Sequence, residues 1–147
     1  MSHHSLSVLL TDFHQNLAKI TDPKQVIHLK LLYNAYNDFG ENALMAWDLG
    51  RANFLLGDFY IIGYLDQNTT LAKSLEITKR IQKTFKSWEE FNKSYMYGYQ
   101  YWSNEDPSDL NPSSMYQKRK KIIEDLKADP NSPFQINWNT VLKKDWK

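Results

Sequence analysis

No proline occurs between Pro23 and Pro107, and this long proline-free stretch constrains the fold more than any other feature of the sequence. Proline removes a backbone N–H donor and clashes with the preceding turn of a helix. The remaining prolines crowd the last third of the chain, where they include Pro112, Pro130 and Pro133. We therefore expect the middle of the chain to be built from helices.

Apolar periodicity and capping residues predict six helical segments. Their approximate ranges are 6–20, 23–40, 41–62, 68–85, 88–102 and 113–127. Two of the starts carry clear caps, because Asp22 precedes a proline at the first helical position and Ser87 with Glu90 has the spacing of a capping box. Strand-like alternation occurs only over residues 134–141. The pattern predicts an all-α, single-domain bundle of about six helices with an irregular C-terminal tail.

The segment 41–62 is apolar on nearly every side of a helix, so we expect it to be a buried central helix. A strip of small residues runs along it, and such a strip lets another backbone approach closely. Its members are Ala43, Ala46, Gly50 and Gly57. Ser94 and Gly98 make a similar gap in segment 88–102, so these two helices are predicted to pack closely together.

Length, charge and cysteine content narrow the class of protein. The chain has 147 residues, 41% of them hydrophobic, which is enough for one domain over residues 1–147 and too short for two ordinary ones. Its formal net charge of +1 makes no strong field that would attract nucleic acid or an anionic membrane. It contains no cysteine, which excludes disulfides and thiolate metal sites.

Targeting signals are also missing from the printed sequence. The N-terminal residues lack the charged region and the cleavage site of a signal peptide. The longest apolar run, residues 43–62, contains Asp48, Arg51 and Asp58, whose charges would be costly in a bilayer. We therefore predict a soluble, cytoplasmic protein with no membrane partner.

The same three charged residues form the first candidate site. Asp48 and Arg51 are three residues apart and can form an ion pair, with Asp58 two turns from Arg51 on the same side. A buried pair of this kind is more often a structural device than a catalytic one, because arginine cannot act as a general base. The alternative is a small-ligand or enzyme pocket beside Asp48, Arg51 and Tyr64.

The segment 88–102 carries the second candidate site. One stripe of this helix is aromatic and is expected to lie in the core, and it consists of Trp88, Phe91, Tyr95, Tyr99 and Trp102. Glu90, Tyr97 and Tyr101 lie on roughly the opposite side, a composition typical of protein-recognition patches. We predict that they bind a partner protein, together with the acidic residues Glu105, Asp106 and Asp109. The alternative places Tyr97 and Tyr101 beneath the C-terminal tail.

Other chemistry has no support in the sequence. The basic run at residues 118–121 is typical of a solvated face, with only the stem of Arg119 on the apolar stripe of its helix, so nucleic-acid binding is disfavoured. The four histidines lack metal-ligand spacing, and no phosphate-binding loop or nucleophile–base pair can be placed. We therefore expect no catalytic residue, no metal and no cofactor.

Several separated motifs resemble the bacterial domain of unknown function numbered 1266. They are residues 46–51 (Ala-Trp-Asp-Leu-Gly-Arg), 63–65 (Gly-Tyr-Leu), 87–91 (Ser-Trp-Glu-Glu-Phe), 94–95 (Ser-Tyr), Gly98 and Trp102. The family's closing Asp-Pro-x-Ser-Pro-Trp and Pro-Trp motifs are matched in part, since Phe134 and Asn137 depart from them. The resemblance covers residues 33–138, and the first two predicted helices, of which the N-terminal one lies within residues 1–22, look like a short N-terminal addition.

The resemblance implies no activity and carries over no catalytic residue. Some members look to be encoded near secreted or contact-delivered toxins, and small proteins with an aromatic helix face are similar in kind to the immunity proteins of contact-dependent growth inhibition and other toxin–antitoxin systems. We therefore predict a non-enzymatic immunity protein that binds and neutralises a cognate bacterial toxin through ~800 Å² of its surface. A homodimer through the same aromatic face is a further alternative.

Overall fold

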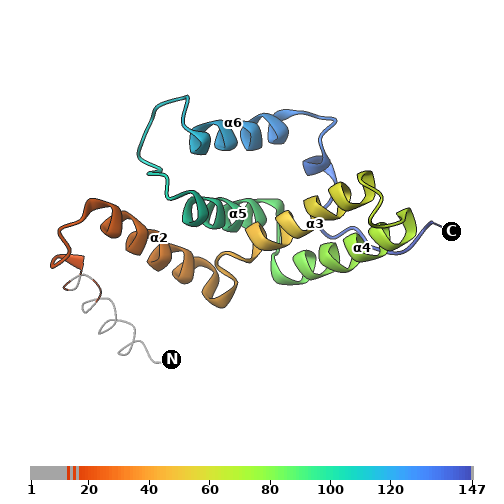
Figure 1. Ribbon diagram of the computed structural model, residues 1–147, viewed down its shortest axis with the longest axis horizontal. Coiled ribbons are helices and arrows are strands. Elements are labelled where there is room, and N and C mark those ends of the chain that lie inside the picture. Colours follow the sequence, from red (N-terminus) through yellow and green to blue (C-terminus); the bar gives the residue numbers. More distant parts are fainter. Residues whose placement is uncertain (1–12, 14, 16, 147) are drawn as a thin grey trace.

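The computed structural model describes residues 13, 15 and 17–146, so most of the helix predicted over residues 6–20 lies outside the described residues. Within the described residues the chain forms five α-helices and two short 3-10 helices, with no β-strand (Figure 1). The α-helices are α2 (Pro23–Phe39), α3 (Met45–Ile61), α4 (Gln67–Thr84), α5 (Trp88–Ser103) and α6 (Met115–Ala128). The 3-10 helices are η1 (Gly40–Asn42) and η2 (Pro133–Gln135). The predicted all-α class is confirmed.

Helix α3 lies at the centre of the arrangement, with α4 and α5 packed against it (Figure 1). Helix α2 packs against α5, while α6 contacts α5 and then η2. The buried core joins Ala46 and Leu49 of α3 to Ile81 and Phe85 at the end of α4. No helix in the described part of the chain is both long enough and apolar enough to cross a bilayer.

The crossing of α3 and α5 is unusually close, as the small residues predict. A Cβ atom added at Gly98 would lie 2.2 Å from the Cβ of Trp47, a distance that no packed structure tolerates. Helix α3 has no side-chain cap from its own N-terminal residues. Ser94 of α5, which is fully buried, supplies this cap instead. The Ala46 amide donates to Ser94 Oγ at 3.3 Å, and that hydroxyl donates to the Ala43 carbonyl at 2.9 Å. Glycine and serine are therefore needed at these positions for the two helices to meet.

Local capping bonds set the other helix starts. The Lys24 amide donates to Asp22 Oδ1 at 2.9 Å, with Pro23 at the first helical position. The predicted capping box is also present, since the Glu90 amide donates to Ser87 Oγ at 3.1 Å. The Glu90 carboxylate reaches back one residue further than expected and accepts from the Lys86 amide at 2.9 Å. These bonds replace intrahelical partners that the first turn lacks.

Helix α3 is central, but the expectation that it is buried all round is wrong for its second half. Phe54 is 70% exposed and Ile61 is 79% exposed, although both are large apolar residues. Helices α4 and α5 cover one side of α3, and α6 packs against α5 and η2 instead of extending along α3. The remaining side of the second half of α3 faces solvent.

The C-terminal segment after η2 has no regular structure but is held against α4 and α5 by side-chain bonds to its carbonyls. Trp88 Nε1 donates to the Ile136 carbonyl at 2.8 Å, and Gln82 Nε2 donates to the carbonyls of Trp138 and of Thr140, the latter at 2.9 Å. Trp138 Nε1 in turn donates to the Phe85 carbonyl at 3.0 Å. The irregular tail that the sequence predicts is therefore an integral part of the fold.

Candidate functional site

The predicted ion pair between Asp48 and Arg51 is absent from the structure. Both side chains are exposed, and the ion pairs among the described residues involve neither of them. Arg51 instead lies over two indole rings, 5.4 Å from the ring centroid of Trp47 and 5.6 Å from that of Trp102. On an exposed surface water solvates the carboxylate, so an ion pair would add little, whereas the indole faces attract the guanidinium directly.

The alternative pocket beside Asp48, Arg51 and Tyr64 is not assembled as expected. Asp48 lines a surface pocket of about 570 Å³ where α2 meets α3, together with Glu41 and Arg80, but neither Arg51 nor Tyr64 lines it. Tyr64 is 76% exposed, and its ring packs 6.2 Å from that of Phe59. Asp58 is half-buried on α3 and forms no ion pair among the described residues. The structure therefore does not combine these four residues into one site.

A second arginine completes the cluster around Trp47. Arg119 of α6 lies 4.4 Å over the ring of Tyr99 and 5.6 Å over that of Trp47, and its Nη1 donates to the Tyr95 hydroxyl at 2.6 Å. Its Nε atom is buried without a hydrogen-bond partner. The stem of Arg119 falls on the apolar stripe of its helix, which is the sequence signal for this inward position, whereas the expectation of a solvated face is wrong for its guanidinium. Two guanidinium groups thus flank one indole, and neither has a carboxylate partner among the described residues.

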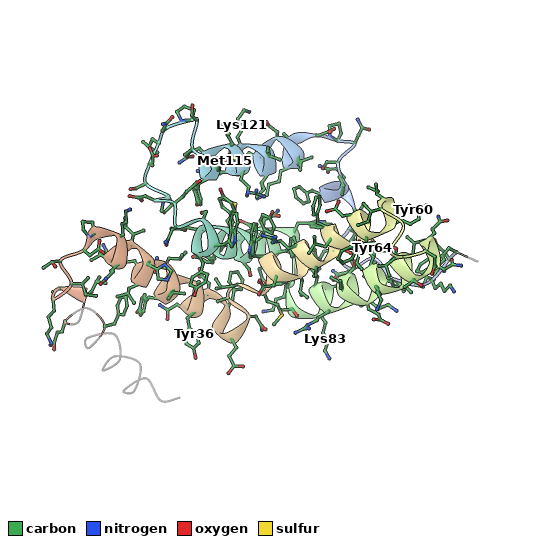
Figure 2. The ribbon with its side chains drawn as sticks, in the orientation of Figure 1. Tyr36, Tyr60, Tyr64, Lys83, Met115 and Lys121 are labelled. Carbon is green, nitrogen blue, oxygen red and sulfur yellow. The ribbon has the colours of Figure 1, made fainter. Side chains whose placement is uncertain are left out.

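From this cluster an exposed strip continues along α3. Residues at spacings of three and four lie along one side of a helix, which places Arg51, Phe54, Asp58 and Ile61 together. Trp102 of α5 is 62% exposed and extends the strip beyond Arg51. We call these five residues the outer α3 surface. Further exposed apolar groups gather where the helix ends, and Figure 2 shows Tyr60 and Tyr64 there.

The outer α3 surface has the composition of a protein-binding site. Large exposed apolar patches on a soluble fold mark interaction surfaces, and tryptophan, tyrosine and arginine are the residues that most often anchor a partner. The guanidinium of Arg51 already packs on two rings, so less side-chain entropy is lost when it binds. The sequence signal for this surface is the apolar character of segment 41–62, but that character alone predicts a buried helix.

The tyrosines of the predicted partner surface contact α2 and not the C-terminal tail. The Tyr97 hydroxyl donates to Asp38 Oδ2 at 2.6 Å, and Lys93 Nζ lies 2.8 Å from the same oxygen. The ring of Tyr101 packs 5.0 Å from that of His28, with 44% of Tyr101 still exposed. Because neither tyrosine is fully buried, the predicted surface remains a prediction, although part of each ring is used to hold α2.

The electrostatics of this contact follow from the shared oxygen. Burial and the bond to Asp38 raise the pKa of Tyr97 well above its ordinary value. Bonds from Lys93 and Tyr97 lower the pKa of Asp38. The neutral phenol and the ionised carboxylate are therefore the forms that stabilise the contact between α2 and α5.

The acidic residues of the predicted surface are engaged in local bonds. Glu105 accepts from the Tyr116 amide at 2.5 Å and from the Tyr99 hydroxyl at 3.3 Å, so it joins the end of α5 to the first turn of α6. Asp106 accepts from the Ser108 hydroxyl at 2.7 Å and from the Ser108 amide at 2.8 Å, and these bonds lower its pKa. Asp109 accepts from the Asn111 amide at 2.9 Å. Together with Glu90 in its capping box, these carboxylates shape turns and helix starts.

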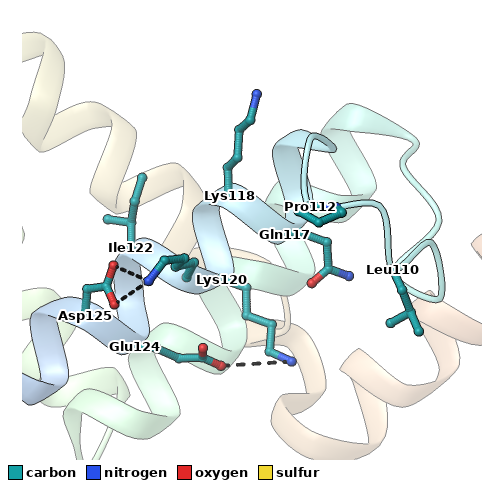
Figure 3. A pocket seen from close by; sticks show the side chains of 9 residues that line it. Leu110, Pro112, Gln117, Lys118, Lys120, Ile122, Glu124 and Asp125 are labelled. Carbon is teal, nitrogen blue, oxygen red and sulfur yellow. Dashed lines mark hydrogen bonds and ion pairs between the residues drawn. The ribbon is translucent and has the colours of Figure 1, made fainter.

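The three lysines of the basic run on α6 are exposed, as expected of a solvated face, whereas Arg119 is not. The exposed side of α6, with the α5–α6 loop, lines a shallow pocket of about 610 Å³ that contains Lys118, Lys120 and Lys121 (Figure 3). Lys121 lies 2.8 Å from Asp125, and Lys120 lies 4.0 Å from Glu124, so two of the lysines are paired within their own helix. Pairs at this spacing neutralise much of the local field. Among the described residues, no group of three or more histidines and carboxylates could hold a metal ion.

Comparison with known proteins identifies the family. The family model described as "Protein of unknown function (DUF1266)" matches residues 5–141, so the chain belongs to this family. The match begins well before residue 33, and the predicted N-terminal helices are therefore part of the family's domain and not an addition to it. No curated protein and no solved structure gives a significant match.

Proposed function

We propose that this member of the DUF1266 family is a protein-binding module that engages its partner through the outer α3 surface, and that it neutralises a cognate bacterial toxin by doing so. The observation that carries the proposal is the exposed strip of Arg51, Phe54 and Ile61 on the central helix, extended by Trp102 of α5. Exposing such residues is unfavourable in water, so a partner that covers them gains the free energy of their burial.

The arrangement also favours binding over catalysis. Arg51 and Arg119 lie against aromatic rings, and the carboxylates near α5 are engaged in caps and turns, so these charged groups already have structural roles. Burial of Phe54 and Ile61 is worth about 1.5–3 kcal/mol each, and a few anchors of this size can produce a nanomolar complex. The net charge of this protein is close to zero. We therefore expect its partner to present apolar pockets and not a surface that binds strongly acidic proteins.

The test is a pull-down of the tagged protein co-expressed with the product of the neighbouring gene, followed by calorimetry. We expect a one-to-one complex that the double variant Phe54→Asp/Ile61→Asp weakens at least about 100-fold, because two carboxylates would be buried without partners. The matched control is Leu110→Asp/Val141→Asp, which adds the same charge at two exposed positions and should bind normally.

A second double variant separates the two candidate surfaces. Tyr97→Ala/Tyr101→Ala alters the surface predicted from the sequence while leaving the outer α3 surface intact. If this variant alone abolishes binding, the partner uses the tyrosine surface and our assignment of α3 is wrong. If the neighbouring product does not bind and sedimentation shows a dimer that Phe54→Asp dissociates, the outer α3 surface serves self-association and the neutralising role is wrong.

A further inference from the structure

We infer that a cavity beneath the C-terminal segment is a binding site for a small, neutral, largely apolar molecule that carries one hydrogen-bond donor. The cavity has a volume of about 340 Å³ and lies between α3, α4, the start of α5 and the segment 136–142. This volume is at the small end of the range for ligand sites, which indicates a compact molecule such as a fused two-ring compound. The inference is independent of the proposed protein-binding function.

The lining of the cavity excludes a charged ligand. Its walls are mostly apolar and aromatic, with Ile81, Trp88, Phe91, Ile136, Trp138 and Leu142 supplying the large side chains. None of the residues that line the cavity is ionisable. A charged molecule would lose its hydration here without gaining a counter-charge, whereas an apolar ring would gain from burial.

The buried hydrogen-bonding atoms in the lining are engaged within the protein, with one exception. The indole N–H groups of Trp88 and Trp138 donate to the carbonyls of Ile136 and Phe85, and the Gln82 amide donates to the Thr140 carbonyl. The Thr78 hydroxyl donates to the carbonyl of Ser74 within α4. These bonds hold the walls in place and leave few groups for a ligand.

Asn53 is the exception. Its Oδ1 atom is buried and has no hydrogen-bond partner, and Asn53 lines the cavity. A buried acceptor that has lost its water is unfavourable until a donor reaches it. A ligand with one N–H or O–H group would satisfy this atom once the Asn53 side chain turns its amide into the cavity, and the apolar body of the ligand would contact the rings of Trp88, Phe91 and Trp138. This pairing defines the chemical class of the ligand.

The cavity lies on a side of α3 that neighbours the outer α3 surface. Around the helix Asn53 is nearly opposite Arg51, about 100° from Phe54 and about 80° from Ile61. The outer wall of the cavity is the C-terminal segment, which is held by the bonds from Trp88 and Gln82. Ligand binding should therefore stabilise this segment.

The experiment compares indole with indene, which has the same two-ring shape but lacks the N–H donor. The probe is the full-length protein labelled with ¹⁵N, and the signals followed are the indole N–H groups of its five tryptophans. We expect indole to shift the signals of Trp88 and Trp138 saturably, and indene to bind about tenfold more weakly, which is the ratio expected for one unsatisfied acceptor. Trp47 and Trp102, in the arginine cluster, serve as internal controls whose signals should not move.

The variant Asn53→Leu removes the acceptor and should abolish the preference for indole over indene. Asn34→Leu, a change at an exposed position of α2, is the matched control and should keep the preference. The inference is overturned if neither compound shifts the signals of Trp88 and Trp138, or if indole and indene bind the unmodified protein equally well. Both of these outcomes are measured on the unmodified protein, so they hold even if Asn53→Leu does not fold.

Discussion

The two halves of α3 are both rich in apolar residues, but their surroundings are opposite. In the first half Ala46, Trp47 and Leu49 are buried against α5 and α4. In the second half Leu56 is buried, while Phe54 and Ile61 are largely exposed. The difference arises because α5 crosses the first half closely and α6 does not extend over the second. Apolar composition therefore shows what can be buried, and only the neighbouring helices decide what is buried.

The largest effect should come from the close crossing itself. We expect Gly98→Ala to destabilise the protein by about 3 kcal/mol or more, because its Cβ would overlap the Cβ of Trp47. The same change in the second half, Gly57→Ala, meets nothing within 4 Å and should stabilise the helix by about 0.5–1 kcal/mol. Urea unfolding of both variants measures the difference, and equal effects would show that the two halves are not distinct.

Truncation of apolar side chains gives the next largest effect. Leu49→Ala removes a core side chain and should cost about 2–4 kcal/mol of unfolding free energy. Phe54→Ala, although it removes a larger group, should change stability by about 0.5 kcal/mol or less, because the ring is mostly in water. Thermal unfolding of the two variants provides the comparison. A large loss with Phe54→Ala would mean that the outer α3 surface is part of the core.

The smallest effect concerns the polar contact that holds α2 to α5. A raised pKa in the folded state means that Tyr97 contributes stability below its ordinary pKa of 10.0, and that this stability is lost as the pH rises above that value. Tyr97→Phe should cost about 1 kcal/mol at pH ~7 and reduce the further loss of stability in alkaline solution. Urea unfolding at about pH 7 and pH 11 tests this.

The control for this prediction is Tyr36→Phe, which alters a tyrosine of α2 that is 60% exposed. It should leave the alkaline loss of stability as large as in the unmodified protein. An unchanged alkaline loss in Tyr97→Phe would show that the bond to Asp38 does not stabilise the folded state.

The candidate sites show why the contacts of charged and aromatic side chains are harder to predict from sequence than helix caps are. The spacing of Asp48 and Arg51 permits an ion pair, but the guanidinium also has Trp47 and Trp102 within reach, and the second ring belongs to another helix. Arg119 likewise reaches rings on two other helices. The partner that each arginine contacts depends on where the other helices lie. Residue spacing within one segment does not predict those positions.

The sequence alone was enough to predict the helices and the capping box at Ser87, because both depend on backbone geometry within a few residues. It also predicted the close crossing at Ser94 and Gly98, because small residues let two backbones approach. The sequence also identified α3 as the helix around which the others pack. Only the tertiary structure decided which side of α3 is exposed, and that Tyr97 and Tyr101 face α2. It alone placed the C-terminal segment over a cavity, because that cavity is formed by residues distant in sequence whose spacing no local rule determines.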